Sequence, residues 1–218
     1  MKPSPFTPYC GLKLGEIAKS IFPPGVFQVF SGDDSLGPWI SAHPGINIVA
    51  FTGSIPTGKR VAASCAKTLK RYILELGDND AAIVCDDVDI EKCLPKITML
   101  AFLNSGQIYM DIKRIYIHEN IYNKFRDAMV DFAKKNIKTG GGFEEGVVNW
   151  PIQNSMQFDV AKGMYSEIDK QGWKPALSGK IRTSSKGFFA EPVIIDNPPD
   201  DSRVVVEEPF APIVPLLK

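Results

Sequence analysis

The sequence lacks an excess of charge of either sign. Lys and Arg together number 25, as do Asp and Glu, so the formal net charge at pH 7 is zero. Without a positive field, non-specific attraction to nucleic acid or to an anionic membrane surface is excluded as a basis for function. We therefore expect small molecules or other proteins as partners.

Cysteine and histidine are too sparse for a metal centre or a disulfide framework. The four cysteines show neither CxxC spacing nor a paired arrangement, and the chain has only two histidines. The residues concerned are Cys10, Cys65, Cys85, Cys93, His43 and His118. This pattern does not support a structural zinc site, and it is typical of reduced thiols in a cytosolic protein.

Long hydrophobic runs are also absent. No apolar run approaches the roughly 18 residues of a membrane-spanning helix, and residues 1–5 lack the apolar core of a signal peptide. The composition, 44% hydrophobic and 23% charged over 218 residues, is that of a globular protein. These features predict a soluble protein of the cytoplasm.

The first third of the chain has the pattern of a βαβ unit. A helical periodicity over Gly11–Phe22 precedes a short apolar stretch, Val26–Phe30, that predicts a strand. The continuous apolar run Ile46–Phe51 predicts a strand buried on both faces. A helix from Pro56 to Leu69 and a strand at Tyr72–Leu74 complete the unit. Such units bind ligands at the carboxyl ends of their strands, where a helix N-terminus offers free N–H groups.

The rest of the chain continues to alternate between strands and helices. The expected strands are Ala81–Val84, Arg114–His118 and Gly187–Ile195, and the expected helices are Ile90–Leu103, Ile121–Phe132 and Met156–Ile168. The chain then stops within an apolar run, Ile213–Leu217, which we expect to require a pairing partner from elsewhere. The whole pattern predicts a parallel-sheet α/β fold.

Four short patterns follow one another along the chain, and each is weak when taken alone. They are Phe51-Thr52-Gly53-Ser54 with Gly58-Lys59, Leu74-Glu75-Leu76-Gly77 with Asn79, Gly106-Gln107, and Glu207-Glu208-Pro209-Phe210-Ala211-Pro212. In this order and spacing they closely resemble the aldehyde dehydrogenase superfamily. Further matches are His43-Pro44-Gly45, Lys113-Arg114-Ile115-Tyr116 and Glu191-Pro192-Val193. The resemblance covers the whole chain but corresponds only to the middle of a typical member.

The resemblance implies a truncated member with two parts. Residues 1–76 would be the residual dinucleotide-binding part, without its first strands, and residues 77–218 a partial catalytic domain without its last strands and oligomerisation arm. The implied cofactor is NAD or NADP. Lys2 would contact its adenosine ribose, and Gly53 and Ser54 would lie near its pyrophosphate at a helix N-terminus.

The resemblance also assigns roles at the reaction centre, with one departure. Glu75 matches the family's general base, Glu208 the residue that holds the nicotinamide ribose, and Phe210 the ring beside the nicotinamide. The family's nucleophilic cysteine stands two residues after Gly-Gln, and this chain has Tyr109 there. A phenol, with a reference pKa of about 10 against about 8.5 for a thiol, is a poorer nucleophile for thioester formation.

Other departures weaken ordinary aldehyde oxidation further. Asp78 stands where the family has a second glycine, and Pro209 replaces an aliphatic residue. The asparagine that stabilises the oxyanion in relatives lies before residue 1, and none of the four cysteines matches a position in the Gly106–Tyr109 loop. The resemblance therefore implies little thioester chemistry.

Three functions remain open at this point. The favoured one is a pseudoenzyme or repurposed enzyme that performs a redox-neutral isomerisation or cyclisation on a carbonyl-containing or hydrophobic metabolite. In it, Tyr109 is either a hydrogen-bond donor or a space-filling plug, and Glu75 or Tyr109 acts as acid or base. The second is an NAD(P)-dependent aldehyde oxidoreductase with an atypical site. The third is a non-catalytic binding partner or truncated gene product that associates with itself or with a paralogous subunit.

Overall fold

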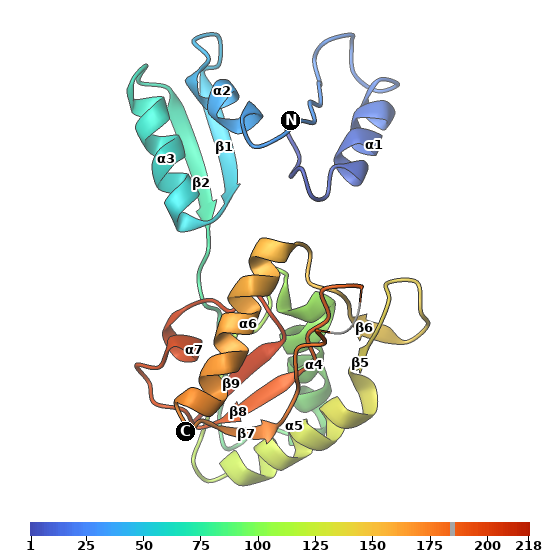
Figure 1. Ribbon diagram of the computed structural model, residues 1–218, viewed down its shortest axis with the longest axis vertical. Helices are drawn as coiled ribbons and strands as arrows, with labels where there is room; N and C mark the ends of the chain where they lie inside the picture. Colours follow the sequence, from blue (N-terminus) through green and yellow to red (C-terminus); the bar gives the residue numbers. More distant parts are fainter. Residues whose placement is uncertain (184–185) are drawn as a thin grey trace. The chain divides into compact units, whose positions relative to one another are not determined.

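The chain folds into two compact units, Met1–Gly77 and Asp78–Lys218, in a computed structural model that describes residues 1–183 and 186–218 (Figure 1). The first unit contains five regular elements: α1 (Tyr9–Ala18), α2 (Leu36–Ala42), β1 (Ile48–Gly53), α3 (Ile55–Ala66) and β2 (Arg71–Leu76). Strands β1 and β2 pair in parallel, with Thr52 opposite Glu75. The β1–α3–β2 segment is therefore the βαβ unit expected from the sequence.

The second unit is built on a five-stranded sheet of order β3-β4-β9-β8-β7. Its strands are β3 (Ala81–Val84), β4 (Arg114–Ile117), β7 (Lys174–Leu177), β8 (Val193–Asp196) and β9 (Ile213–Leu217). All neighbours are parallel except β7, which runs antiparallel to β8. The unit also contains α4 (Ile90–Phe102), the 3₁₀ turn η1 (Leu103–Gly106), α5 (Tyr122–Asn136), β5 (Lys138–Thr139), β6 (Val147–Asn149), α6 (Ser155–Lys170) and α7 (Arg203–Val206).

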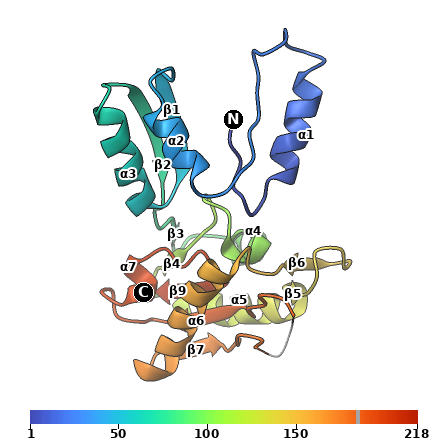
Figure 2. The same cartoon turned by 45° about the horizontal axis from the view of Figure 1, so that its top comes forward.

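Helices cover both faces of this sheet, which makes the second unit a three-layer α/β/α sandwich (Figures 1 and 2). Alternate strand residues separate into two buried cores because successive side chains point to opposite faces. Ile194 and Leu216 pack with α4 and α5, whereas Ile195 and Leu217 pack with α6. The predicted α/β fold with parallel strands is confirmed, and no helix among the described residues is long and apolar enough to cross a membrane.

Four local expectations were wrong. The strand expected at Ile46–Phe51 forms as β1, but its residues are exposed or half-buried and not buried on both faces. Val26–Phe30 is not a strand: its backbone contacts are few, such as Phe30 N–H donating to the Met1 carbonyl, and no neighbouring strand pairs with it. The strand expected at Gly187–Ile195 begins only at Val193. The apolar run Ile213–Leu217 needs no outside partner, because as β9 it is fully buried between β4 and β8 of its own sheet.

Candidate functional site

In the first unit, the carboxyl ends of β1 and β2 bring together three of the expected residues. Gly53 ends β1, Ser54 is the N-cap residue of α3, and Glu75 lies exposed on β2 opposite Thr52. The Ser54 side chain does not cap the helix, because its hydroxyl donates instead to Thr57 Oγ1 at 3.1 Å. The N-terminus of α3 therefore keeps free backbone N–H groups, which can donate hydrogen bonds to a bound anion.

Lys2, the other residue expected on this side, makes only a local contact. Its Nζ donates to the carbonyl of the adjacent Pro3 at 3.1 Å, and the side chain is partly buried. This contact leaves the ammonium with donor capacity for a ligand, since a lysine has three N–H groups.

In the second unit, the Gly106–Tyr109 loop begins with an unusual backbone. Asn104, Ser105 and Gly106 all have positive φ, at 51°, 60° and 66°. Two consecutive non-glycine residues in this left-handed region are strained, so other contacts must hold them there. The buried Ser105 hydroxyl donates to the Trp150 carbonyl, and a Cβ on Gly106 would lie 2.6 Å from the Ala211 carbonyl oxygen.

Gln107 ties the same loop to the segment before α6. Its Nε2 donates to the Asn104 carbonyl at 2.9 Å, and its Oε1 accepts the Gln153 N–H at 2.9 Å. Both ends of the amide are therefore used. The family-like Gly-Gln pair has a clear structural role here: glycine permits the close packing, and glutamine joins two segments distant in sequence.

Beneath the loop lies Lys113, which is only 2% exposed. Its Nζ donates to the Gly106 carbonyl at 2.8 Å and to the Ile108 carbonyl at 2.7 Å. The same atom lies 5.1 Å from the centroid of the Phe210 ring. Burial lowers the pKa of Lys113, while the carboxyl groups of Asp111 and Glu208 oppose that shift.

The segment Glu208–Phe210 approaches this loop from the other end of the unit's sequence. Phe210 has a φ of 44°, and Gln157 Nε2 donates to the carbonyls of both Pro209 and Phe210 at 3.1 Å. Glu208 is partly buried, and this burial raises its pKa against the effect of Lys113. Two strained loops are thus held together around one ammonium group.

Further carboxyl groups surround Lys113. Asp111 is 1% exposed, accepts the Ile108 N–H through Oδ2 at 3.3 Å, and has its pKa raised by burial to about 6. The pKa of Asp80 is also raised, by burial and by the neighbouring Asp78. The charged form of each of these acids is disfavoured by desolvation, so Lys113 is the attractive partner that limits the shift.

Tyr109, at the nucleophile position, is not part of this buried network. Its side chain is 68% exposed, and it makes no hydrogen bond within the part of the chain that the structure describes. A ligand at the loop would therefore meet a phenol that is free to donate or accept. The four cysteines lie elsewhere: Cys10 and Cys65 in α1 and α3, Cys85 just after β3, and Cys93 in α4.

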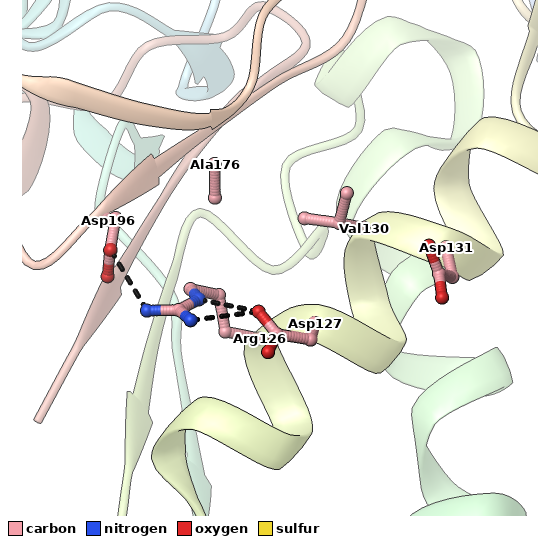
Figure 3. A pocket seen from close by; sticks show the side chains of 6 residues that line it. All are labelled: Arg126, Asp127, Val130, Asp131, Ala176 and Asp196. Atoms are coloured by element: carbon pink, nitrogen blue, oxygen red, sulfur yellow. Dashed lines mark hydrogen bonds and ion pairs between the residues drawn. The ribbon is translucent and has the colours of Figure 1, made fainter.

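A pocket of about 430 Å³ in the second unit lies away from these residues (Figure 3). It is lined by α5, β7 and β8, and Arg126 lies in it between the carboxylates of Asp127 and Asp196, at 2.9 and 3.1 Å. Since this cation is already paired with two carboxylates, it is not free to bind an anionic substrate. Within residues 1–183 and 186–218, no group of three or more His, Cys, Asp or Glu is arranged to hold a metal.

The expected site residues thus form two sets, one in each unit. Gly53, Ser54 and Glu75 share the strand ends of the first unit, and Tyr109, Glu208 and Phe210 belong to two joined loops of the second. The sequence did not reveal Lys113, Asp111 or Gln157. Lys113 is followed by Arg114, the first residue of β4, and two adjacent cations give no sign in the sequence that one of them is buried.

The chain is similar to known proteins over nearly its whole length. The model of the aldehyde dehydrogenase family matches residues 1–218. The chain belongs to the aldehyde dehydrogenase family. A "Probable aldehyde dehydrogenase" from a Pseudomonas species is 41% identical over 95% of this chain and 42% of its own length. This chain therefore spans less than half the length of that relative.

Solved structures of aldehyde dehydrogenases match the fold closely. Betaine aldehyde dehydrogenase of Staphylococcus aureus, in complex with NAD+, superposes with a TM-score of 0.91 at 30% identity, over 99% of this chain and 44% of that one. A mutant of aldehyde dehydrogenase C from Pseudomonas syringae, with NAD+ and octanal, has a TM-score of 0.91 at 29% identity, over 99% of this chain and 45% of that one. The family resemblance and the aldehyde-dehydrogenase-like fold are confirmed.

Proposed function

We propose that this aldehyde dehydrogenase family protein binds carbonyl-containing metabolites at the Gly106–Tyr109 loop and converts them without net oxidation. The observation that carries the proposal is the state of Tyr109, whose phenol is 68% exposed and unpaired among the described residues. It favours the donor role of this side chain over the role of a buried plug. The loop that presents it is held by Ser105, Gln107 and Lys113.

The proposed chemistry is enolisation of the bound carbonyl compound. The Tyr109 O–H donates a hydrogen bond to the carbonyl oxygen, and a base removes a proton from the adjacent carbon. The enol is then protonated at carbon again, or its nucleophilic carbon attacks an electrophile within the same molecule, which gives isomerisation or cyclisation without an oxidant.

The first unit supports cofactor binding as a separate part of the proposal. The N-terminus of α3 at Ser54, without a side-chain cap, fits a pyrophosphate, and Lys2 has donors for a ribose. NAD or NADP would accept a hydride when bound. The alternative function, an aldehyde oxidoreductase with an atypical site, therefore requires that the chain binds one of these cofactors. Calorimetric titration of the purified chain with NAD and NADP tests it: micromolar affinity supports that alternative, and no binding excludes every cofactor-dependent role.

To test the main proposal, the purified protein is incubated with octanal in D₂O without cofactor, and deuterium incorporation into octanal is measured. Octanal is the ligand named for the Pseudomonas syringae structure. The expected result is deuterium at the carbon next to the aldehyde, detected by NMR, with a rate roughly 10- to 100-fold lower in Tyr109→Phe. Phenylalanine keeps the ring and removes only the hydroxyl. Equal rates in the two proteins, or no incorporation by the wild type, would show the proposal to be wrong.

A protein partner is the second candidate function, and a specific observation favours it. In the first unit β1 and β2 form a sheet of two strands, and the Ile48 and Ile73 side chains on it are about half exposed. A second copy or a paralogous subunit would cover such a surface. Sedimentation of the purified chain tests this: a concentration-independent monomer argues against self-association. The four free thiols support a reducing location such as the cytoplasm.

A further inference from the structure

Lys113 contacts both loops of the second unit's site through one functional group. Its ammonium donates to the carbonyls of Gly106 and Ile108 at 2.8 and 2.7 Å, directly before Tyr109. The same Nζ lies 5.1 Å from the Phe210 ring centroid, within the range of a cation–π contact. A single cation therefore touches the loop that carries the phenol and the loop that carries the aromatic ring.

Burying this cation is costly unless its surroundings compensate it. With a side chain that is 2% exposed, Lys113 has lost nearly all contact with water. Two carbonyl oxygens and the π face of Phe210 take the place of that water. The carboxyl groups of Asp78, Asp80, Asp111 and Glu208 add electrostatic attraction that favours the charged form of the lysine. An apolar residue would fill the same space without this cost. We therefore attribute the presence of a charged residue here to its contacts with the two loops.

Both loops need such a restraint, because both are strained. Asn104, Ser105 and Phe210 are non-glycine residues with positive φ, and such conformations persist only where the surroundings over-determine them. The Gly106 carbonyl belongs to the Gly106–Gln107 peptide and the Ile108 carbonyl to the Ile108–Tyr109 peptide, so two hydrogen bonds from one ammonium fix both of these peptide planes. Without them, the loop would be free to relax and move Tyr109.

We propose that Lys113 is a positioning residue that holds the Tyr109 loop and the Phe210 loop in one fixed relation. This inference deepens the proposed function, on which its catalytic meaning rests, but the coupling of the loops is independent of any substrate. Lys113→Met keeps the length of the side chain and removes the ammonium. Lys113→Arg restores a cation with several donors and is the rescue variant.

Hydrogen exchange measured by mass spectrometry on the folded protein tests the coupling. In Lys113→Met, peptides covering 104–111 and 207–211 are expected to exchange roughly 10- to 100-fold faster, while β4 and α5 keep their protection. Lys113→Arg should recover part of the protection in both loops. Lys124→Met, on the exposed surface of α5, is the control for loss of a lysine and should change nothing.

Three results would overturn the proposal: unchanged exchange in both loops, acceleration in only one of them, or a uniform loss of protection across the second unit. If Lys113→Met does not fold, Phe210→Leu gives the same decision, because it removes only the ring over the ammonium. Faster hydrogen exchange in peptides covering 104–111 of that variant supports coupling through Lys113. Unchanged exchange in these peptides contradicts it. Octanal deuteration measured on the same proteins separates this inference from the proposed chemistry, since exchange requires no substrate.

Discussion

Replacing Asp111 by asparagine should change how the stability of the protein depends on pH. Asp111 is 1% exposed, and burial raises its pKa to about 6 in the folded chain. An aspartate in an unfolded chain titrates near 3.9. Because the folded pKa is the higher one, the stabilising contribution of the protonated carboxyl is complete below about pH 4. It is lost as the pH rises through about 6.

The size of the effect follows from the shift. About two pKa units correspond to roughly 3 kcal/mol in total, of which about 2 kcal/mol is lost between pH 4.5 and 7.5. Asparagine has nearly the same shape, its Oδ1 can still accept the Ile108 N–H, and it does not titrate. The free energy of unfolding of the wild type, relative to Asp111→Asn, should therefore fall by about 2 kcal/mol over that interval.

Urea unfolding of both proteins at several pH values measures this difference. Comparing the change with pH removes any constant effect of the amide. Asp131→Asn, at an exposed position of α5, controls for the loss of one negative charge. A difference between wild type and Asp111→Asn that stays constant with pH, or that grows in favour of the wild type as the pH rises, would refute the reasoning.

Two further substitutions test the packing around the site. Gly106→Ala should lower the free energy of unfolding by about 2 to 4 kcal/mol, because alanine is disfavoured at a φ of 66° and its Cβ would lie 2.6 Å from the Ala211 carbonyl oxygen. Gly142→Ala, where the Cβ meets nothing within 4 Å, is the matched control, and equal losses in urea unfolding would contradict the argument. Tyr122→Phe should cost about 1 to 3 kcal/mol, because the buried phenol donates to Asp196 Oδ1 at 2.6 Å and contacts the Leu216 carbonyl at 3.2 Å. Tyr9→Phe, at an exposed position of α1, should leave calorimetric unfolding unchanged, and a similar loss in both variants would count against a role for the Tyr122 hydrogen bonds.

Regular elements were predictable where apolar periodicity is long and local. Helix α5 and strand β3 follow directly from such patterns. Val26–Phe30 has the same apolar character, yet it forms no strand, because no neighbouring strand pairs with it. The sequence of the segment itself does not show whether such a partner strand exists. The opposite holds for Ile213–Leu217, whose partners β4 and β8 lie within the chain.

The site was predictable only in part, for a related reason. Tyr109 and Phe210 were found through motifs whose residues are adjacent in sequence. The burial of Lys113 depends on carbonyls of the Tyr109 loop and on a ring from Phe210, which are brought to it by the tertiary fold. A lysine in a sequence carries no sign of such acceptors, so its usual exposed state is the default expectation.

The position of β9 in the sheet has a consequence for how the second unit folds. Ile115 of β4 pairs with Leu216 of β9, so the central pairing of the sheet joins segments at opposite ends of the unit. Closing so long a loop is slow, because chain entropy is lost before the contact forms. During synthesis β3 and β4 would leave the ribosome well before β9, with an unpaired edge that attracts other strands. The second unit is therefore expected to depend on chaperones until its last strand is in place.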